Sequence, residues 1–221
     1  MTFFLVLLFP KQQPLKTAIN TYSKTDTGIL LAKNILKLSV AGFFIGSFHA
    51  QDAWVAVTLA VYLAYSLVKK FRSHAEDRYV FLTGSLLGGL LGVCCEAWGI
   101  YYGHWEYHDL GGRAFPYWLP FAWALAFTFV YQLEKDLFAS LRMERMRDKV
   151  ILTLLVALIF PTYGEIITIQ MGVWTYAWPY PFFGVPLLAI FLLIVFHTGV
   201  NYLMVQICRK MGWKNEVFRP A

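Results

Sequence analysis

The pattern of apolar and polar positions divides the chain into six long apolar runs separated by short polar stretches. A helix that crosses the hydrocarbon core of a bilayer needs roughly 20 mostly apolar residues. The six runs are near this length and cover residues 29–49, 53–68, 79–101, 115–133, 150–170 and 181–207. We therefore expect an all-α fold, a polytopic membrane helical bundle of about six transmembrane helices.

The N-terminal part of this pattern is the least regular. Lys33 and Lys37 lie inside the first run and would have to extend toward the lipid headgroups. The apolar run at residues 3–9 is too short to cross a membrane, and we expect an interfacial or re-entrant piece rather than a signal peptide. The expected organisation is an N-terminal interfacial segment (1–28), a first helical hairpin (29–78), two further hairpins (79–147 and 148–208) and a cytoplasmic tail (209–221).

Composition and charge agree with a membrane location. Of 221 residues, 58% are hydrophobic and only 14% are charged, which leaves too little polar surface to cover a water-soluble domain. Every Lys and Arg except Arg113 lies before residue 38 or within 69–78, 135–149 and 209–219. Because basic residues accumulate in cytoplasmic loops, we expect both termini to be cytoplasmic. The net charge of +6 then reflects anionic lipid headgroups rather than nucleic acid, and we expect an integral protein of a bacterial inner membrane.

Two stretches of the chain resemble each other. EAWGIYYGHWEY begins at Glu96 and EIITIQMGVWTY begins at Glu165, an offset of 69 residues. The alignment matches Glu96 with Glu165, Gly103 with Gly172, Trp105 with Trp174 and Tyr107 with Tyr176, and after a three-residue gap it matches Pro120 with Pro186. We expect a tandem parallel two-helix repeat, in which both glutamates lie at a similar depth near the non-cytoplasmic face.

Small or helix-kinking residues precede each glutamate at intervals of four. They are Gly84, Gly88 and Gly92 before Glu96, and Thr153, Ala157 and Pro161 before Glu165. Such stripes let helices approach closely, and an ionisable group facing lipid is costly. We therefore expect both glutamates to face the bundle interior, in a functional site or paired structurally with a neighbouring polar group. The Trp and Tyr of each motif either line that interior or form an interfacial belt.

Other polar residues carry weaker signals. His104 and His108 would suit a metal ion if their loop were helical, but Gly103, Gly111 and Gly112 argue for a turn, so we expect no metal. His197 and Asn201 share a helix face and are expected to make interhelical hydrogen bonds. Tyr163 either lines the glutamate cavity or caps it. The chain has no phosphate loop or dinucleotide fingerprint, and we expect no cofactor.

The two glutamates suggest proton chemistry. An apolar cavity disfavours the charged form of a carboxyl group, which can then keep its proton and donate it. Aromatic ring faces can stabilise a carbocation when water is excluded, and a second carboxylate can accept a proton or orient water. An alkene or polyene dissolved in the membrane is a substrate that fits these groups.

The same residues carry a resemblance to known families. The run containing Glu96, Gly99, Gly103, Trp105 and Tyr107, followed by Pro120, Ala122 and Trp123, resembles the membrane carotenoid hydratases that act on bacterioruberin precursors. The second copy, with Gly172, Trp174, Tyr176, Gly184 and Pro186, is similar to the lycopene cyclase domain of heterodimeric bacterial and fungal carotenoid enzymes. The resemblance implies a small multispan enzyme that protonates, cyclises or hydrates isoprenoid double bonds without a redox cofactor.

The expected function is therefore an integral membrane enzyme of the hydratase or cyclase type. Glu96 and Glu165 would be its acid and base in either order, and its hydrophobic isoprenoid-type substrate would reach it from the lipid bilayer. The residues expected to line the cavity are Trp105, Tyr107, Trp174, Tyr176 and Tyr163. Two alternatives remain: a membrane carrier or binding protein that uses the glutamates for proton or cation coupling, and a non-catalytic membrane scaffold.

Overall fold

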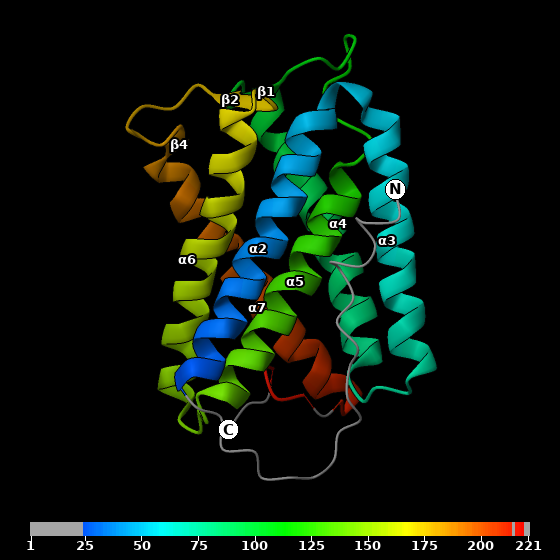
Figure 1. Ribbon diagram of the computed structural model, residues 1–221, viewed down its shortest axis with the longest axis vertical. Helices are drawn as coiled ribbons and strands as arrows, with labels where there is room; N and C mark the ends of the chain where they lie inside the picture. Colours follow the sequence, from blue (N-terminus) through cyan, green and yellow to red (C-terminus); the bar gives the residue numbers. More distant parts are fainter. Residues whose placement is uncertain (1–23, 214, 219–221) are drawn as a thin grey trace.

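The computed structural model describes residues 24–213 and 215–218, and this part of the chain is mostly helical. Its helices stand side by side in one bundle (Figure 1). They are α2 (Lys24–Phe48), α3 (Asp52–Arg72), α4 (Arg78–Tyr101), α5 (Leu119–Ser140), α6 (Met146–Gln170) and α7 (Leu187–Met211). Residues 1–23 of the expected interfacial segment lie outside the described residues, and α2 already begins within that segment.

The surface of the bundle is that of a membrane protein. Among the described residues, four segments are long and apolar enough to cross a membrane. They are Asp26–Arg72, which covers most of α2, the 3-10 turn His49–Gln51 and α3, and the segments of α4, α6 and α7. Large apolar side chains such as Leu90 and Val61 are more than 60% exposed on these helices. Apolar surface of this extent marks contact with lipid or a partner rather than with water.

Helix α5 is the central helix of the bundle. It packs against α2, α3, α4 and α6, and half of its residues are buried. Its expected bounds, 115–133, are wrong at both ends, because Pro120 occupies the first turn of a helix that begins at Leu119 and continues to Ser140. The longer helix carries Glu134 into the bundle, where its side chain is fully buried.

The last apolar run was expected to be one helix from residue 181, and this is wrong. Residues Pro181–Phe182 (β3) and Val185–Pro186 (β4) pair as a short antiparallel hairpin, and α7 begins only at Leu187. The turn contains Phe183 and Gly184 with positive φ, a backbone conformation that a helix does not allow. His197 therefore lies ten residues inside α7, about 15 Å from the N-terminal end of that helix.

The expected close approach along the glycine stripe of α4 is confirmed. A Cβ atom built on Gly84 would lie 2.0 Å from the ring of Phe127, and one built on Gly92 would lie 2.2 Å from the ring of Trp123. The aromatic side chains of α5 thus occupy the space that side chains on α4 would need. This is why α4 and α5 form the most extensive helix pair of the bundle.

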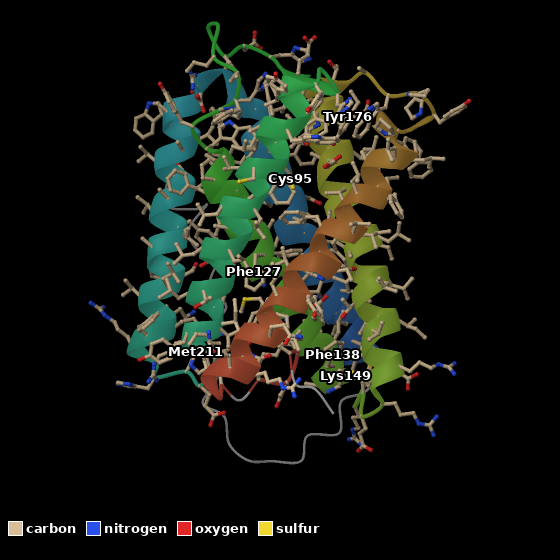
Figure 2. The ribbon with its side chains drawn as sticks, turned by 180° about the vertical axis from the view of Figure 1, so that it is seen from behind. Cys95, Phe127, Phe138, Lys149, Tyr176 and Met211 are labelled. Carbon is tan, nitrogen blue, oxygen red and sulfur yellow. The ribbon has the colours of Figure 1, made fainter. Side chains whose placement is uncertain are left out.

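The two ends of the bundle are closed differently. We call the end that carries Asp77 and Phe218 the inner end, and the opposite end, which carries Asp52 and Arg113, the outer end. At the inner end Asp77 accepts hydrogen bonds from Lys70, Lys135 and the hydroxyl of Tyr131, at 2.8, 2.9 and 3.0 Å. Burial raises the pKa of Asp77, but the bonds from Lys135 and Lys70 outweigh it and lower the pKa to about 2. Figure 2 shows Phe138, Lys149 and Met211 at this end of the molecule.

The described part of the expected tail folds back onto the inner end. Asn215 donates a hydrogen bond of 2.6 Å to the hydroxyl of Tyr131, and the ring of Phe218 stacks on that of Tyr131 with 5.6 Å between centroids. Phe218 is only 2% exposed. The tail therefore belongs to the core of the inner end.

At the outer end, the loop between α4 and α5 is held by an ion pair. Arg113 pairs with Asp52 at the start of α3, and the other oxygen of Asp52 accepts a 2.8 Å bond from the backbone N–H of Tyr117. The guanidinium of Arg113 also lies 4.0 Å from the centre of the Tyr117 ring. Arg113, the basic residue outside the four basic segments of the sequence, thus fixes this loop over the bundle.

Candidate functional site

The two sequence motifs meet across the outer end of the bundle. Strand β1 (Trp105–Tyr107) follows α4, strand β2 (Trp174–Tyr176) follows α6, and the two strands pair antiparallel (Figure 1). The register places Trp105 opposite Tyr176 and Tyr107 opposite Trp174. Segments 69 residues apart in the chain therefore form one small sheet.

The local sequence of each motif explains its geometry. Gly103 has a φ of 67° and Gly172 a φ of 78°, left-handed values that glycine adopts without a steric cost. Each glycine turns the chain out of its helix, and the strand begins two residues later. Because side chains alternate along a strand, the Trp and Tyr of each motif share one face, while Glu106 and Thr175 lie exposed on the other.

Glu96 lies beneath this sheet and is held by two indole rings. Trp105 Nε1 donates to its Oε2 at 2.8 Å, and Trp123 Nε1 donates to its Oε1 at 3.0 Å. Gly92 and Gly99 make room for these rings, since a Cβ atom would lie 2.2 Å from the Trp123 ring and 1.9 Å from the Trp105 ring, respectively. The glycines four residues before and three residues after Glu96 thus leave the space that its two indole donors occupy.

Glu165 approaches the same aromatic pair from the other side. Its Oε2 accepts a hydrogen bond of 2.9 Å from the hydroxyl of Tyr176, whose ring centroid lies 5.6 Å from that of Trp105. Helix α4, which carries Glu96, and helix α6, which carries Glu165, each pack against both α5 and α7. Each carboxylate is therefore bonded to one member of the Trp105–Tyr176 pair. Figure 2 shows Tyr176 at this end, above Cys95 on α4.

The two tyrosines remain protonated hydrogen-bond donors. Burial, followed by the charge of Glu96, raises the pKa of Tyr107 well above its usual range, and Glu165 acts on it as well. For Tyr176, burial and then the charges of Glu165 and Glu96 raise the pKa in the same way. Both carboxylates thus lie within electrostatic reach of both phenols, as a shared site requires.

A wider set of aromatic rings surrounds this centre. The rings of Trp178 and Trp105 lie 5.6 Å apart, those of Trp178 and Tyr176 lie 5.8 Å apart, and those of Tyr107 and Trp174 lie 5.4 Å apart. Sequence reasoning missed Trp178 and the bond from Trp123 to Glu96. Trp178 follows Tyr176 by two residues, so its place in the same alternation was the available signal.

The remaining candidates lie elsewhere. The hydroxyl of Tyr163 is 2.7 Å from that of Ser39 on α2, and no hydrogen bond among the described residues joins it to either glutamate. His104 accepts a bond from Trp178 Nε1, while His108 contacts Thr175. Across residues 24–213 and 215–218, no three His, Cys, Asp or Glu side chains gather in a way that could hold a metal ion.

A second polar cluster lies deeper in the bundle. Oε1 of Glu134 is 2.8 Å from Nε2 of His197, and Asn201 lies 3.0 Å from the same nitrogen. The interhelical role expected of His197 is confirmed, although its partner on α5 was missed. Oε2 of Glu134 is buried and has no hydrogen-bond partner among the described residues.

Two hollows flank the glutamate site. A groove of about 380 Å³ lies between α4 and α7, with apolar walls that include Leu91, Cys95, Phe196 and Gly199. The ring of Phe196 is 4.6 Å from that of Trp123, the residue bonded to Glu96. A second hollow, of about 620 Å³, lies along the strand pair and includes the polar side chains Glu106, Arg113 and Thr175.

Comparison with protein-family models, with curated proteins and with solved structures finds no match for this chain. The chemistry of the site is therefore inferred from its own residues and their contacts.

Replacing Gly99 by Ala should break the bond between Trp105 and Glu96. The new Cβ atom would overlap the indole ring, and leaving a buried carboxylate oxygen without a donor costs about 1–3 kcal/mol. Gly164→Ala is the matched control, because its Cβ atom would meet Leu38 at an ordinary 3.4 Å one residue before Glu165. Thermal unfolding of both variants in detergent measures the difference. Equal melting temperatures would contradict the tight fit at Gly99.

Proposed function

We propose that this chain is an integral membrane enzyme that protonates isoprenoid double bonds, of the carotenoid or terpenoid hydratase or cyclase type, without a redox cofactor. One observation carries the proposal: Glu96 and Glu165 come from different helices and bond to the adjacent aromatic rings of Trp105 and Tyr176. Such a site offers an acid, a base and ring faces in one place.

The proposed reaction begins with proton transfer. One carboxyl group gives its proton to a carbon of the double bond, so that a C–H bond forms, the π bond breaks and a cation remains on the neighbouring carbon. Rings within about 6 Å stabilise such a cation, more strongly when water is excluded. The other carboxylate then takes a proton. In hydration the proton comes from a water molecule whose oxygen bonds to the cation, and in cyclisation from a carbon next to the cation after ring closure.

The two hollows suit the two reactants of hydration. The groove between α4 and α7 has no charged side chain and lies on helices apolar enough for a membrane, so it would receive the hydrocarbon chain of the substrate. The hollow along the strands is polar and would admit water. Trp105, which bonds to Glu96, lines the polar hollow, and Phe196, which lines the groove, contacts the ring of Trp123, the other indole bonded to Glu96.

We further propose that the helices form six crossings with both termini in the cytoplasm of a bacterium, and that the chain contains a parallel repeat. The register of β1 and β2 supports the repeat. Glu106 lies opposite Thr175, its counterpart in the second motif, as a local two-fold axis along the membrane normal would require. The charged cluster around Asp77 and the tail supports a cytoplasmic inner end.

A second candidate function, a proton or cation carrier, is favoured by the deep cluster. Glu134 is fully buried and its partner His197 is partly buried between helices, and ionisable residues inside a membrane bundle often form proton relays. A carrier needs polar groups at more than one depth, which an enzyme acting only at the outer end does not.

Replacing Glu96 or Glu165 by Gln should each lower product formation by about 100-fold or more, because general acid–base groups contribute roughly 10²–10⁴-fold. The chain is coexpressed with a pathway that makes linear carotenoids, and the pigments are analysed by mass. Glu106→Gln is the matched control, since this exposed carboxylate lies on the opposite face of the same strand. Equal product from all variants would instead favour a scaffold.

An apolar chain in the groove should protect Cys95 from modification. Cys94 and Cys95 are both exposed, but of these two only Cys95 lines the groove, and Cys208 is buried. We expect squalene to slow the reaction of Cys95 with a maleimide several-fold in Cys94→Ser protein. The reaction of Cys94 in Cys95→Ser protein should not change. Equal protection of both thiols would count against entry through this groove.

Proton flux separates the two functions. The carrier function predicts that vesicles holding the protein dissipate an imposed pH gradient faster than empty vesicles, and that Glu134→Gln abolishes the difference, since it removes the ionisable group of the deep cluster. Under the enzyme function we expect no flux above that of empty vesicles. A pH-sensitive dye inside the vesicles measures the rate, and flux lost in Glu134→Gln would displace the enzyme proposal.

A further inference from the structure

The hydrogen-bond partners of the two glutamates differ: each has the hydroxyl of its own motif's tyrosine, Tyr107 for Glu96 and Tyr176 for Glu165, but only Glu96 also has two indole donors. An indole N–H can donate a hydrogen bond but cannot accept one. Each oxygen of Glu96 faces one indole donor, Trp105 at Oε2 and Trp123 at Oε1. A proton on either oxygen would point at an N–H group or displace it. This environment therefore favours the carboxylate form of Glu96, which accepts both bonds as charge-assisted hydrogen bonds.

The hydrogen bond of Glu165 is compatible with either protonation state of its carboxyl group. Its carboxyl group is bonded to Tyr176, whose hydroxyl can turn to donate or to accept. Its side chain is also less buried than that of Glu96. A protonated Glu165 can therefore keep a hydrogen bond with Tyr176, with the direction of that bond reversed.

The sequence explains why the two copies differ. Trp123 comes three residues after Pro120, and the position three residues after the matched Pro186 is Ala189. In the first copy the indole of Trp123 extends from the following helix to Glu96. The second copy has no indole at the matched position. Ala189 is buried, and its methyl group offers no hydrogen-bond donor to Glu165.

The surroundings of the pair favour a single proton. The titratable groups that face it are Tyr107 and Tyr176 from the strands and Cys95 beside Glu96 on α4. Among the described residues, no Lys, Arg or His side chain makes a hydrogen bond or ion pair with either glutamate. Two nearby carboxylates without a basic partner repel each other, so one of them holds a proton.

We infer that Trp123 is a positioning residue that, together with Trp105, keeps Glu96 as the carboxylate and leaves the proton of the pair on Glu165. The assignment of roles rests on the proposed function: Glu165 is then the acid that protonates the substrate, and Glu96 is the base. The protonation states themselves do not depend on any substrate.

Infrared spectroscopy of the purified full chain in detergent tests the inference. A protonated carboxyl group gives a C=O band that shifts in heavy water. At about pH 6, above the ordinary pKa of a glutamate, such a band marks a carboxyl group that its surroundings keep protonated. We expect the band in the unmodified protein and in Glu96→Gln, and its loss in Glu165→Gln. Glu134→Gln identifies any part of the band that comes from the deep cluster.

Removing one indole donor tests the role of Trp123 directly. Trp123→Phe leaves Oε1 of Glu96 without its indole donor, so Glu96 should take up a proton and a second C=O band should appear. The double variant Trp123→Phe, Glu96→Gln should lack this second band. Trp118→Phe is the matched control, because Trp118 Nε1 is buried without a partner among the described residues. Its spectrum should match that of the unmodified protein.

Two results would overturn the inference. One is a C=O band that disappears in Glu96→Gln and persists in Glu165→Gln, and the other is a spectrum of Trp123→Phe identical to that of Trp118→Phe. Because the spectra require no substrate, they are independent of the pigment experiment. If the spectra show the expected bands but coexpression of the glutamate variants leaves the pigments unchanged, the proton assignment is supported and the proposed enzyme function is contradicted.

Discussion

The outer end of this bundle depends on supplying hydrogen-bond donors to two carboxylates inside an apolar environment. A buried charge without such partners is costly in a protein and more so within a bilayer. Glu96 and Glu165 obtain their donors from Trp105, Trp123, Tyr107 and Tyr176, none of which belongs to the helix of its acceptor. The turns at Gly103 and Gly172, the pairing of β1 with β2 and the glycines of α4 all serve to bring those donors into place.

The two ends of the bundle treat carboxylates in opposite ways. Asp77 at the inner end is paired with Lys70 and Lys135, which hold its pKa at about 2 and keep it ionised at any physiological pH. At the outer end the donors of Glu96 and Glu165 are neutral aromatic groups. Neutral donors stabilise a carboxylate without neutralising it, so its charge stays available to attract a proton or a cation. This difference makes Asp77 a structural residue and the two glutamates the candidates for chemistry.

The sequence predicted the helices better than it predicted the contacts between them. Apolar runs located the helices of the described chain, since the length of a crossing limits where such a run can lie. The start of α7 was wrong because Pro181–Pro186 is as apolar as a helix, and only the turn at Gly184 excludes one. Glu134 was missed because it precedes Lys135 and Asp136, a charged stretch of the kind that usually ends a span.

The glutamates and the Trp and Tyr of each motif could be found from the sequence, because the same spacing occurs twice. Their convergence could not, because a pair of three-residue strands has no signal of its own at a separation of 69 residues. Trp123 was hidden for a related reason. On a largely apolar helix a tryptophan is expected to pack against other apolar side chains. The role of its N–H group as a donor is evident only from the structure, where the buried acceptor lies 3.0 Å away.

If one glutamate of a duplicated site is to act as the acid and the other as the base, the two copies must differ in the surroundings they give their glutamates. Two identical hairpins facing each other would give their glutamates identical surroundings, and neither would be preferred as the acid. In the proposed repeat the equivalence is broken at two indoles. Trp105 bonds to Glu96 whereas its counterpart Trp174 has no hydrogen bond to Glu165 among the described residues, and Trp123 of the first copy corresponds to Ala189 of the second. These donors lower the free energy of a negative charge on Glu96 and do nothing for Glu165. An acid and a base can thus arise from two copies of one residue through a change on a neighbouring helix.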